Sequence, residues 1–194
     1  IARLTRTFGP TMLMNDSKAL SQFIKKAINK ENIVLIGMPG VGKSTIGVVL
    51  AKVLGYKFID ADLVIQEQTG RLLKDIIAEE GIDEFINIEN KVNASINTEK
   101  SIIATGGSVV YGKEAMEHLS EIGTVIYLKL DLDSLSKRLG SLEKRGVVLK
   151  DGQTLEDLFN ERTPLYEKYA DIIINEHGYT IQQTVKLIEA KLGV

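Results

Sequence analysis

The chain has 194 residues, 26% of them charged, and a net charge of −2, a length that suits one domain with a single core. The near-neutral charge gives no electrostatic footprint for nucleic acids or anionic membranes, and the expected partner is a small molecule. A monomer is expected rather than an oligomer. The absence of cysteine excludes disulfides and thiolate metal sites, and no apolar run approaches the roughly 18 residues of a membrane span, which together favour a cytoplasmic protein.

The first 31 residues are expected to lie outside the main domain. Residues 1–13 begin without methionine and contain a Gly-Pro breaker pair, so we predict a segment that is disordered or foreign to the natural chain. Residues 14–31 carry apolar side chains at helical spacing, after an Asp-Ser pair that can cap a helix. We therefore predict an N-terminal amphipathic helix over 14–31 and a single domain over 32–194.

A phosphate-binding loop follows the apolar run from Ile33 to Ile36. Residues 37–44 read Gly-Met-Pro-Gly-Val-Gly-Lys-Ser, a complete G-x-x-x-x-G-K-[ST] motif between a predicted strand and a predicted helix. The glycines allow successive backbone N–H groups to point into one concavity, where they and the helix N-terminus bind phosphate oxygens. Lys43 would reach the β- and γ-phosphates, and the Ser44 hydroxyl would bind Mg²⁺. The predicted nucleotide-binding residues of the loop are Gly37, Gly40, Val41, Gly42, Lys43, Ser44 and Thr45.

Strands and helices alternate through the rest of the chain. Gly70 and Gly81 are expected to break the helical region after the second strand into three helices. Thr154 and Asp157 form a capping-box-like start to a later helix. The polar, glycine-containing segment 140–153 is predicted to be a mobile loop. The predicted strands are 33–36, 56–59, 101–105, 124–130 and 171–175, and the predicted helices are 45–54, 63–68, 72–80, 82–96, 113–121, 131–139, 154–169 and 181–192.

This alternation predicts an α/β fold, in which a parallel sheet is covered by helices on both faces. Ligands of such sheets bind at the carboxyl ends of the strands. The same edge should therefore carry the phosphate loop, the Asp60 and Asp62 pair, the Gly106-Gly107 pair and whatever follows Leu130.

Two carboxylates leave the end of the second predicted strand, beside the phosphate loop. Asp60 would support Mg²⁺ through water, and Asp62 would accept or orient the proton of an acceptor hydroxyl. The alternative is that Asp62 only caps the helix beginning at Leu63. Gly106 and Gly107 either form a tight turn or allow close approach of the backbone to a ligand.

Further along the chain come Ala104-Thr105-Gly106-Gly107, Arg138, Arg145 and Arg162-Thr163-Pro164-Leu165-Tyr166. Together with the phosphate loop and Asp60-x-Asp62, these motifs resemble the shikimate kinase family. The resemblance covers about residues 32–192 and implies a three-layer sandwich of the P-loop kinase type, with a five-stranded parallel sheet and a mobile lid at about 140–153. It also implies transfer of the γ-phosphoryl group of ATP, with Mg²⁺, to a hydroxyl of shikimate, a step of aromatic amino acid biosynthesis.

On the acceptor side, the resemblance assigns a role to each matching residue. Asp62 resembles the base that binds the acceptor hydroxyls, and Gly106 and Gly107 match glycines that contact the substrate. Arg162 matches one of two arginines that hold the substrate carboxylate, and Glu89 is counted with the substrate residues.

On the donor side, Asp60 resembles a residue near Mg²⁺, and Arg138 the arginine that lies against adenine. Arg145 matches the lid arginine that closes over the phosphates. An arginine on a glycine-flanked loop can arrive late and neutralise charge in the transition state, with water excluded. The expected catalytic residues are therefore Lys43, Asp62 and Arg145.

The chain departs from the family pattern at two important positions. The pattern Phe-Arg-x-x-Glu reads Phe-Ile-Asn-Ile-Glu here, so Ile86 replaces the second carboxylate-binding arginine, and Ser108 replaces the third glycine of Gly-Gly-Gly. Losing a charge-assisted contact of this kind costs roughly 1.5 to 3 kcal/mol, or one to two decades in affinity. Glu89 then loses its expected partner. A milder change is Arg-Gly-Val-Val in the lid, where the family has Arg-Pro-Leu-Leu.

Three functions remain open at this point. The first is a shikimate kinase, and the second is a sister kinase that phosphorylates a polyol or a hydroxy amino acid. The third is a nucleotide-binding regulatory protein without phosphotransfer, which the presence of Lys43, Ser44, Asp62 and Arg145 disfavours. A GTPase is disfavoured because the guanine-reading motif Asn-Lys-x-Asp is absent.

Overall fold

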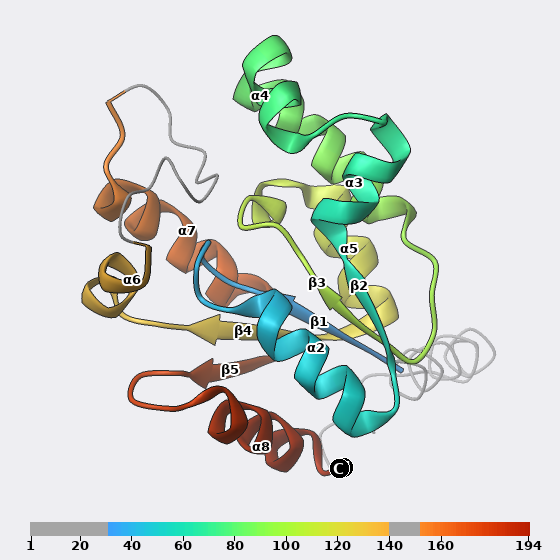
Figure 1. Ribbon diagram of the computed structural model, residues 1–194, viewed down its shortest axis with the longest axis vertical. Coiled ribbons are helices and arrows are strands. Elements are labelled where there is room, and N and C mark those ends of the chain that lie inside the picture. The colour runs from blue at the N-terminus through green and yellow to red at the C-terminus, as the bar shows by residue number, and fades with distance from the viewer. Residues whose placement is uncertain (1–30, 140–151) are drawn as a thin grey trace, which may run out of the picture. The chain divides into compact units, whose positions relative to one another are not determined.

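A single parallel sheet organises the computed structural model, which describes residues 31–139 and 152–194. The strand order is β2-β3-β1-β4-β5, with β1 at the centre (Figure 1). Ile33 of β1 is in register with Ile102 of β3 on one side and Thr124 of β4 on the other. The strands are β1 (Asn32–Ile36), β2 (Lys57–Asp60), β3 (Ser101–Ala104), β4 (Gly123–Lys129) and β5 (Ile172–Asn175). The predicted five-stranded parallel sheet is confirmed.

Helices cover both faces of this sheet, which confirms the three-layer arrangement. The helices α2 and α8 lie on one face, and α5 and α7 lie on the other (Figure 1). The described helices are α2 (Lys43–Leu54), α3 (Ala61–Thr69), α4 (Leu73–Ser95), the short 3-10 helix η1 (Val109–Tyr111), α5 (Lys113–Ile122), α6 (Leu132–Leu139), α7 (Leu155–Tyr169) and α8 (Ile181–Leu192).

Local signals in the sequence set several of the helix ends. Gly70 ends α3 in the left-handed conformation, with φ of 66°. Gly81 interrupts α4 with a non-helical φ of 84° and ψ of 172°, so the predicted break is confirmed, and α4 consists of two helical parts joined by a kink. Thr154 and Asp157 form the predicted capping box of α7, with both reciprocal hydrogen bonds present.

The main core lies between the sheet and its covering helices. The side chains from Val34 to Ile36 of β1 are fully buried, as are Val125, Ile126 and Leu128 of β4. Central parallel strands are covered on both faces and therefore read as continuous apolar runs. A smaller apolar cluster joins α3 to α4 and consists of Ile65, Ile76, Phe85 and Val92, with Ile86 packed against it.

Some predictions fall outside the described residues. These are the leading segment 1–13, the helix over 14–31 and most of the lid, including Arg145. In the part of the chain that the structure does describe, no helix combines the length and the hydropathy needed to cross a bilayer.

Candidate active site

The phosphate loop connects β1 to α2 in a conformation that requires its glycines. Gly37, Gly40 and Gly42 have φ of 146°, 80° and 109°, in the region that residues with a side chain rarely adopt. A Cβ atom on Gly37 would also lie 2.6 Å from the carbonyl oxygen of Leu128. At the N-terminus of α2, no side chain caps the helix. The loop can therefore offer its backbone N–H groups and the positive end of the helix dipole to an anion.

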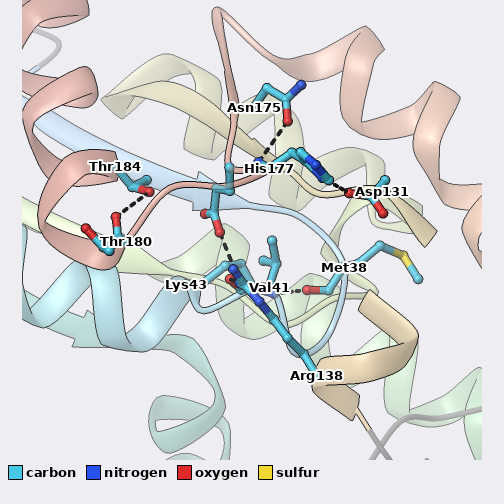
Figure 2. Close-up of polar contacts among 10 residues, drawn as sticks. Met38, Val41, Lys43, Asp131, Arg138, Asn175, His177, Thr180 and Thr184 are labelled. Carbon is cyan, nitrogen blue, oxygen red and sulfur yellow. Dashed lines mark hydrogen bonds and ion pairs between the residues drawn. The ribbon is translucent and has the colours of Figure 1, made fainter. Parts of the chain in front are cut away.

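Lys43 lies inside this loop. Its Nζ donates hydrogen bonds to the carbonyl oxygens of Gly37 and Met38, at 2.8 and 3.1 Å, and Figure 2 shows the contact to Met38. Burial lowers the pKa of Lys43 to about 8, although the carboxylate of Asp62 opposes that shift. The lysine is thus pre-positioned where the terminal phosphates of a nucleotide would lie.

Asp60 joins the end of β2 to the phosphate loop. Its Oδ2 accepts a hydrogen bond of 2.8 Å from the Ser44 hydroxyl, and its Oδ1 accepts one of 3.1 Å from the backbone N–H of Asp62. Asp60 is therefore the side chain that caps α3. The alternative that Asp62 is only a helix cap is wrong, because Asp60 performs that role and leaves the Asp62 side chain available to the cavity.

A cavity of about 750 Å³ extends from the phosphate loop toward α4. Burial raises the pKa of the Asp62 carboxyl in its wall, and the charge of Asp60 raises it further. The remaining wall comes from residues 105–108, from α4 and from α7. The side chains that supply its charge are Lys43, Asp62, Lys74, Glu89 and Arg162.

Gly106 and Gly107 form the floor between these charged groups. A Cβ atom on Gly106 would overlap the Glu89 carboxylate and lie 3.1 Å from Oδ1 of Asp62. A Cβ atom on Gly107 would lie 2.7 Å from the Pro39 ring. Neither position has room for a side chain, because the backbone packs closely against Glu89 and Pro39, and both glycines line the cavity wall.

Arg162 reaches the cavity from α7 and is 96% buried, with 4% of its surface exposed. Its guanidinium lies over the Tyr111 ring, 5.1 Å from the centroid, and its Nε donates a hydrogen bond of 3.2 Å to the Tyr111 hydroxyl. The Tyr166 hydroxyl donates to the carbonyl oxygen of Gly107 at 2.6 Å. These contacts fix the guanidinium beside the glycine pair, and a fixed guanidinium is well suited to a carboxylate.

Glu89 is buried in the same wall without a strong partner. Neither of its carboxylate oxygens makes a hydrogen bond of ordinary geometry among the described residues. The Ser108 hydroxyl is close enough to favour the ionised form, but burial has the larger effect and raises the pKa of Glu89 to about 7. Ser108 and Ile86 are the two positions that depart from the family pattern. Ser108 therefore lies beside the carboxylate that the arginine expected at position 86 would have paired with. Ile86 itself packs into the small apolar cluster.

A second pocket, of about 400 Å³, lies on the other side of the phosphate loop. Arg138 spans its edge, because its Nη1 donates to the carbonyl oxygen of Val41 at 2.9 Å and lies 3.3 Å from Oε2 of Glu176 (Figure 2). Burial raises the pKa of Glu176 to about 7. The pocket wall also includes Tyr179 and Thr180, from the loop after β5.

Comparison with known proteins gives a consistent result. The family model described as shikimate kinase matches residues 39–192. The shikimate kinase of Francisella tularensis subsp. novicida is 38% identical over 169 residues, covering 85% of this chain and 96% of that protein. The shikimate kinase of Persephonella marina is 33% identical over 162 residues, covering 83% and 98%.

The chain belongs to the shikimate kinase family. Among solved structures, the Acinetobacter baumannii shikimate kinase in complex with shikimate superposes with a TM-score of 0.74 at 30% identity, covering 87% of this chain and 97% of that one. The resemblance read from the motifs is thereby confirmed, and so is the prediction of an enzyme of the kinase class with a P-loop fold.

The structure brings most of the expected shikimate kinase residues to one edge of the sheet. Asp60, Asp62 and Glu89 lie with residues 105–108 and Arg162 around or beside the main cavity, while Arg138 lies at the second pocket. Val41 and Thr45 line the second pocket as well. Arg145 lies outside the described residues.

Sequence reasoning missed several residues of this site. Glu176 directly follows β5, so the strand-end rule could have identified it. Tyr111 could not have been found, because its contact with Arg162 joins residues 51 positions apart. Lys74 was also missed, since a lysine in a charged helix is usually a solvated residue.

Proposed function

We propose that this chain is a shikimate kinase that transfers the γ-phosphoryl group of ATP to a hydroxyl of shikimate. The observation that carries the proposal is that one cavity joins the phosphate loop, with Lys43, to Asp62 and Arg162. A phosphoryl donor and a hydroxyl acceptor bound in one cavity can meet in line, and phosphoryl transfer depends chiefly on such positioning and on charge stabilisation.

On the donor side, the backbone N–H groups of residues 37–45 would hold the phosphates. Lys43 would exchange its carbonyl partners for phosphate oxygens, which would keep its ammonium charged despite burial. Arg138 and the second pocket would hold the base, because the pocket borders the loop at Val41 and Gly42. Arg145 is proposed, from its position in the lid, as the residue that closes over the phosphates.

The residues beside the loop also fit Mg²⁺. Mg²⁺ prefers oxygen ligands and usually keeps several waters when it bridges phosphates. The Ser44 hydroxyl and the Asp60 carboxylate, 2.8 Å apart, supply such oxygens, and the described residues contain no cluster of three or more metal-binding side chains. Bound there, Mg²⁺ would neutralise charge on the β- and γ-phosphates.

On the acceptor side, Asp62 would bind the reacting hydroxyl and accept its proton. Its raised pKa keeps the carboxyl closer to the range in which a base can take a proton and later release it. Gly106 and Gly107 would let the hydroxylated ring of shikimate approach the backbone. The Arg162 guanidinium would bind the carboxylate of shikimate.

The deciding experiment is an ATP-consumption assay with shikimate and a panel of polyols and hydroxy amino acids. We expect saturable, Mg²⁺-dependent turnover of shikimate, and loss of about 10²- to 10⁴-fold in kcat for Asp62→Asn, the usual contribution of a general base. Asp83→Asn is the matched control, because Asp83 is an exposed carboxylate of α4. Turnover of a hydroxy amino acid with none of shikimate would replace this proposal with the sister kinase, whose ammonium-bearing acceptor the unpaired Glu89 would favour.

A further inference from the structure

Around the cavity, the carboxylates outnumber the buried cations that are free to bind an acceptor. Of the charged groups there, Asp62 and Glu89 are acidic, and Lys43 is committed to the phosphate loop. Among the described residues, Arg162 is then the one buried cation that faces an anionic acceptor. Position 86 supplies no cation, because it is an isoleucine. Ile86 packs into the small apolar cluster and does not line the cavity.

A further lysine faces the same cavity from the first part of α4. Lys74 lines the wall together with Ile77 and Ala78, three and four residues later. That spacing places the three side chains on one face of the helix. The bend at Gly81 then redirects α4, so that Phe85 and Glu89 line the wall from its second part.

The charge of Lys74 is not neutralised by its own helix. The residues one turn further along α4, Ile77 and Ala78, include no acid. The nearby carboxylates of Glu79 and Glu80 are both paired with Arg71. Among the described residues, no hydrogen bond or ion pair of Lys74 is found, and its side chain is exposed at the cavity. An unpaired ammonium on the wall of this cavity is available to bind an anionic acceptor, whereas a lysine that faces bulk solvent is not.

We propose that Lys74 is a specificity-determining residue of the acceptor site, where its ammonium binds the carboxylate of the acceptor together with Arg162. This inference rests on the proposed function and adds a residue to it. Lysine is suited to the role for two reasons: its flexible side chain can reach over an open cavity, and its compact charge can bind a carboxylate without a fixed geometry. The positive charges of Lys74 and Arg162 would balance the carboxylates of Asp62 and Glu89. The site would then repel the carboxylate of the acceptor less.

The contribution of Lys74 should be moderate, because it starts from an exposed position. Exposed ion pairs contribute less than charge-assisted bonds in buried sites. We therefore expect Lys74→Met to raise the KM for shikimate roughly three- to tenfold, while kcat and the KM for ATP change little. Lys74→Arg, which keeps the charge, should stay within about twofold of the wild type.

The test compares shikimate with its neutral methyl ester in steady-state assays at saturating ATP. If Lys74 recognises the carboxylate, Lys74→Met raises the KM for the acid and leaves the KM for the ester unchanged. Lys91→Met is the matched control, since Lys91 is an exposed lysine of the same helix away from the cavity, and it should alter neither constant.

Two results would overturn the assignment. Equal KM changes for acid and ester would mean that Lys74 acts through the shape of the wall, and unchanged constants for both would mean that it does not contact the acceptor. Absence of shikimate turnover by the wild-type protein is a different result, because it removes the proposed function itself, whereas turnover without dependence on Lys74 removes only this inference.

Discussion

Glu89 is a buried carboxyl whose expected arginine partner is an isoleucine in this chain. Burial and the charge of Asp62 raise its pKa to about 7, while Ser108, Arg162 and Lys43 favour the ionised form without overcoming burial. A buried carboxylate without a hydrogen-bonded cation is costly to ionise. At neutral pH the residue is therefore close to its midpoint, and its protonation changes the charge of the acceptor site.

This pKa predicts how the stability of the protein depends on pH. Because the folded protein holds the Glu89 proton up to about pH 7, while the unfolded chain releases it near 4.5, unfolding becomes easier as pH rises between these values and the full cost applies above pH 7. Glu89→Gln keeps the shape and cannot ionise. Its free energy of unfolding, relative to the wild type, should rise by on the order of 2 to 3 kcal/mol from pH 5 to pH 8.

Urea unfolding of both proteins at several pH values measures this difference. Glu176, whose pKa is also raised to about 7, titrates equally in both proteins and cancels in the comparison. Parallel stability curves for the wild type and Glu89→Gln would contradict the shift.

The phosphate loop is the element on which both the fold and the site depend. It follows the central strand, and its first glycine faces the neighbouring strand β4 at Leu128. Gly37 therefore serves both the anion-binding loop and the close packing of that loop against the sheet.

Gly55, the cap of α2, has a left-handed backbone with φ of 69° but has open space around it.

These two glycines allow the effects of backbone strain and of crowding to be separated. Gly55→Ala should cost about 1 kcal/mol, the penalty of placing a side chain in the left-handed region. Gly37→Ala should cost roughly 1 to 3 kcal/mol more, because its Cβ would also press against the Leu128 carbonyl oxygen. Urea denaturation measures both costs, and equal losses for the two variants would show that the contact with β4 is unimportant.

For the molecule as a whole, nucleotide binding at the carboxyl edge of the sheet would stabilise the folded state. The phosphate loop, the strand end at Asp60 and the loop after β5 would all contact one nucleotide, although they are separated in the chain. A ligand that binds only the folded protein raises its stability by mass action.

ATP with Mg²⁺ should therefore raise the melting temperature. At about 100 times its dissociation constant, ATP should add about 2.7 kcal/mol, equivalent to roughly 5 to 10 °C for a domain of this size. Removing Mg²⁺ with EDTA should cancel part of this increase, and Ser44→Ala should lose the Mg²⁺-dependent part while unfolding near the wild-type temperature without ligand. An increase that is the same with and without Mg²⁺ would argue against the Ser44 and Asp60 metal site. Differential scanning fluorimetry suffices for these comparisons.

The sequence alone determined the succession of strands and helices along the chain, the phosphate loop and the resemblance to the family. Those features depend on local rules: apolar runs predict buried strands, glycines at 37, 40 and 42 predict the loop, and Gly70 and Gly81 predict the helix breaks. The strand-end rule also placed Asp62 and the glycine pair at one edge, because it depends only on the direction of parallel strands.

Only the tertiary structure decided how the charges of the site are matched. It showed that Asp60 caps α3 and so leaves Asp62 to the cavity, that Ser108 lies beside Glu89, and that Lys74 lines the same cavity as Arg162. Each of these depends on which side chains face each other across elements that are distant in the chain, on burial, and on the bend of α4. Charge matching is a property of three-dimensional proximity, whereas a sequence motif records only residue type and spacing.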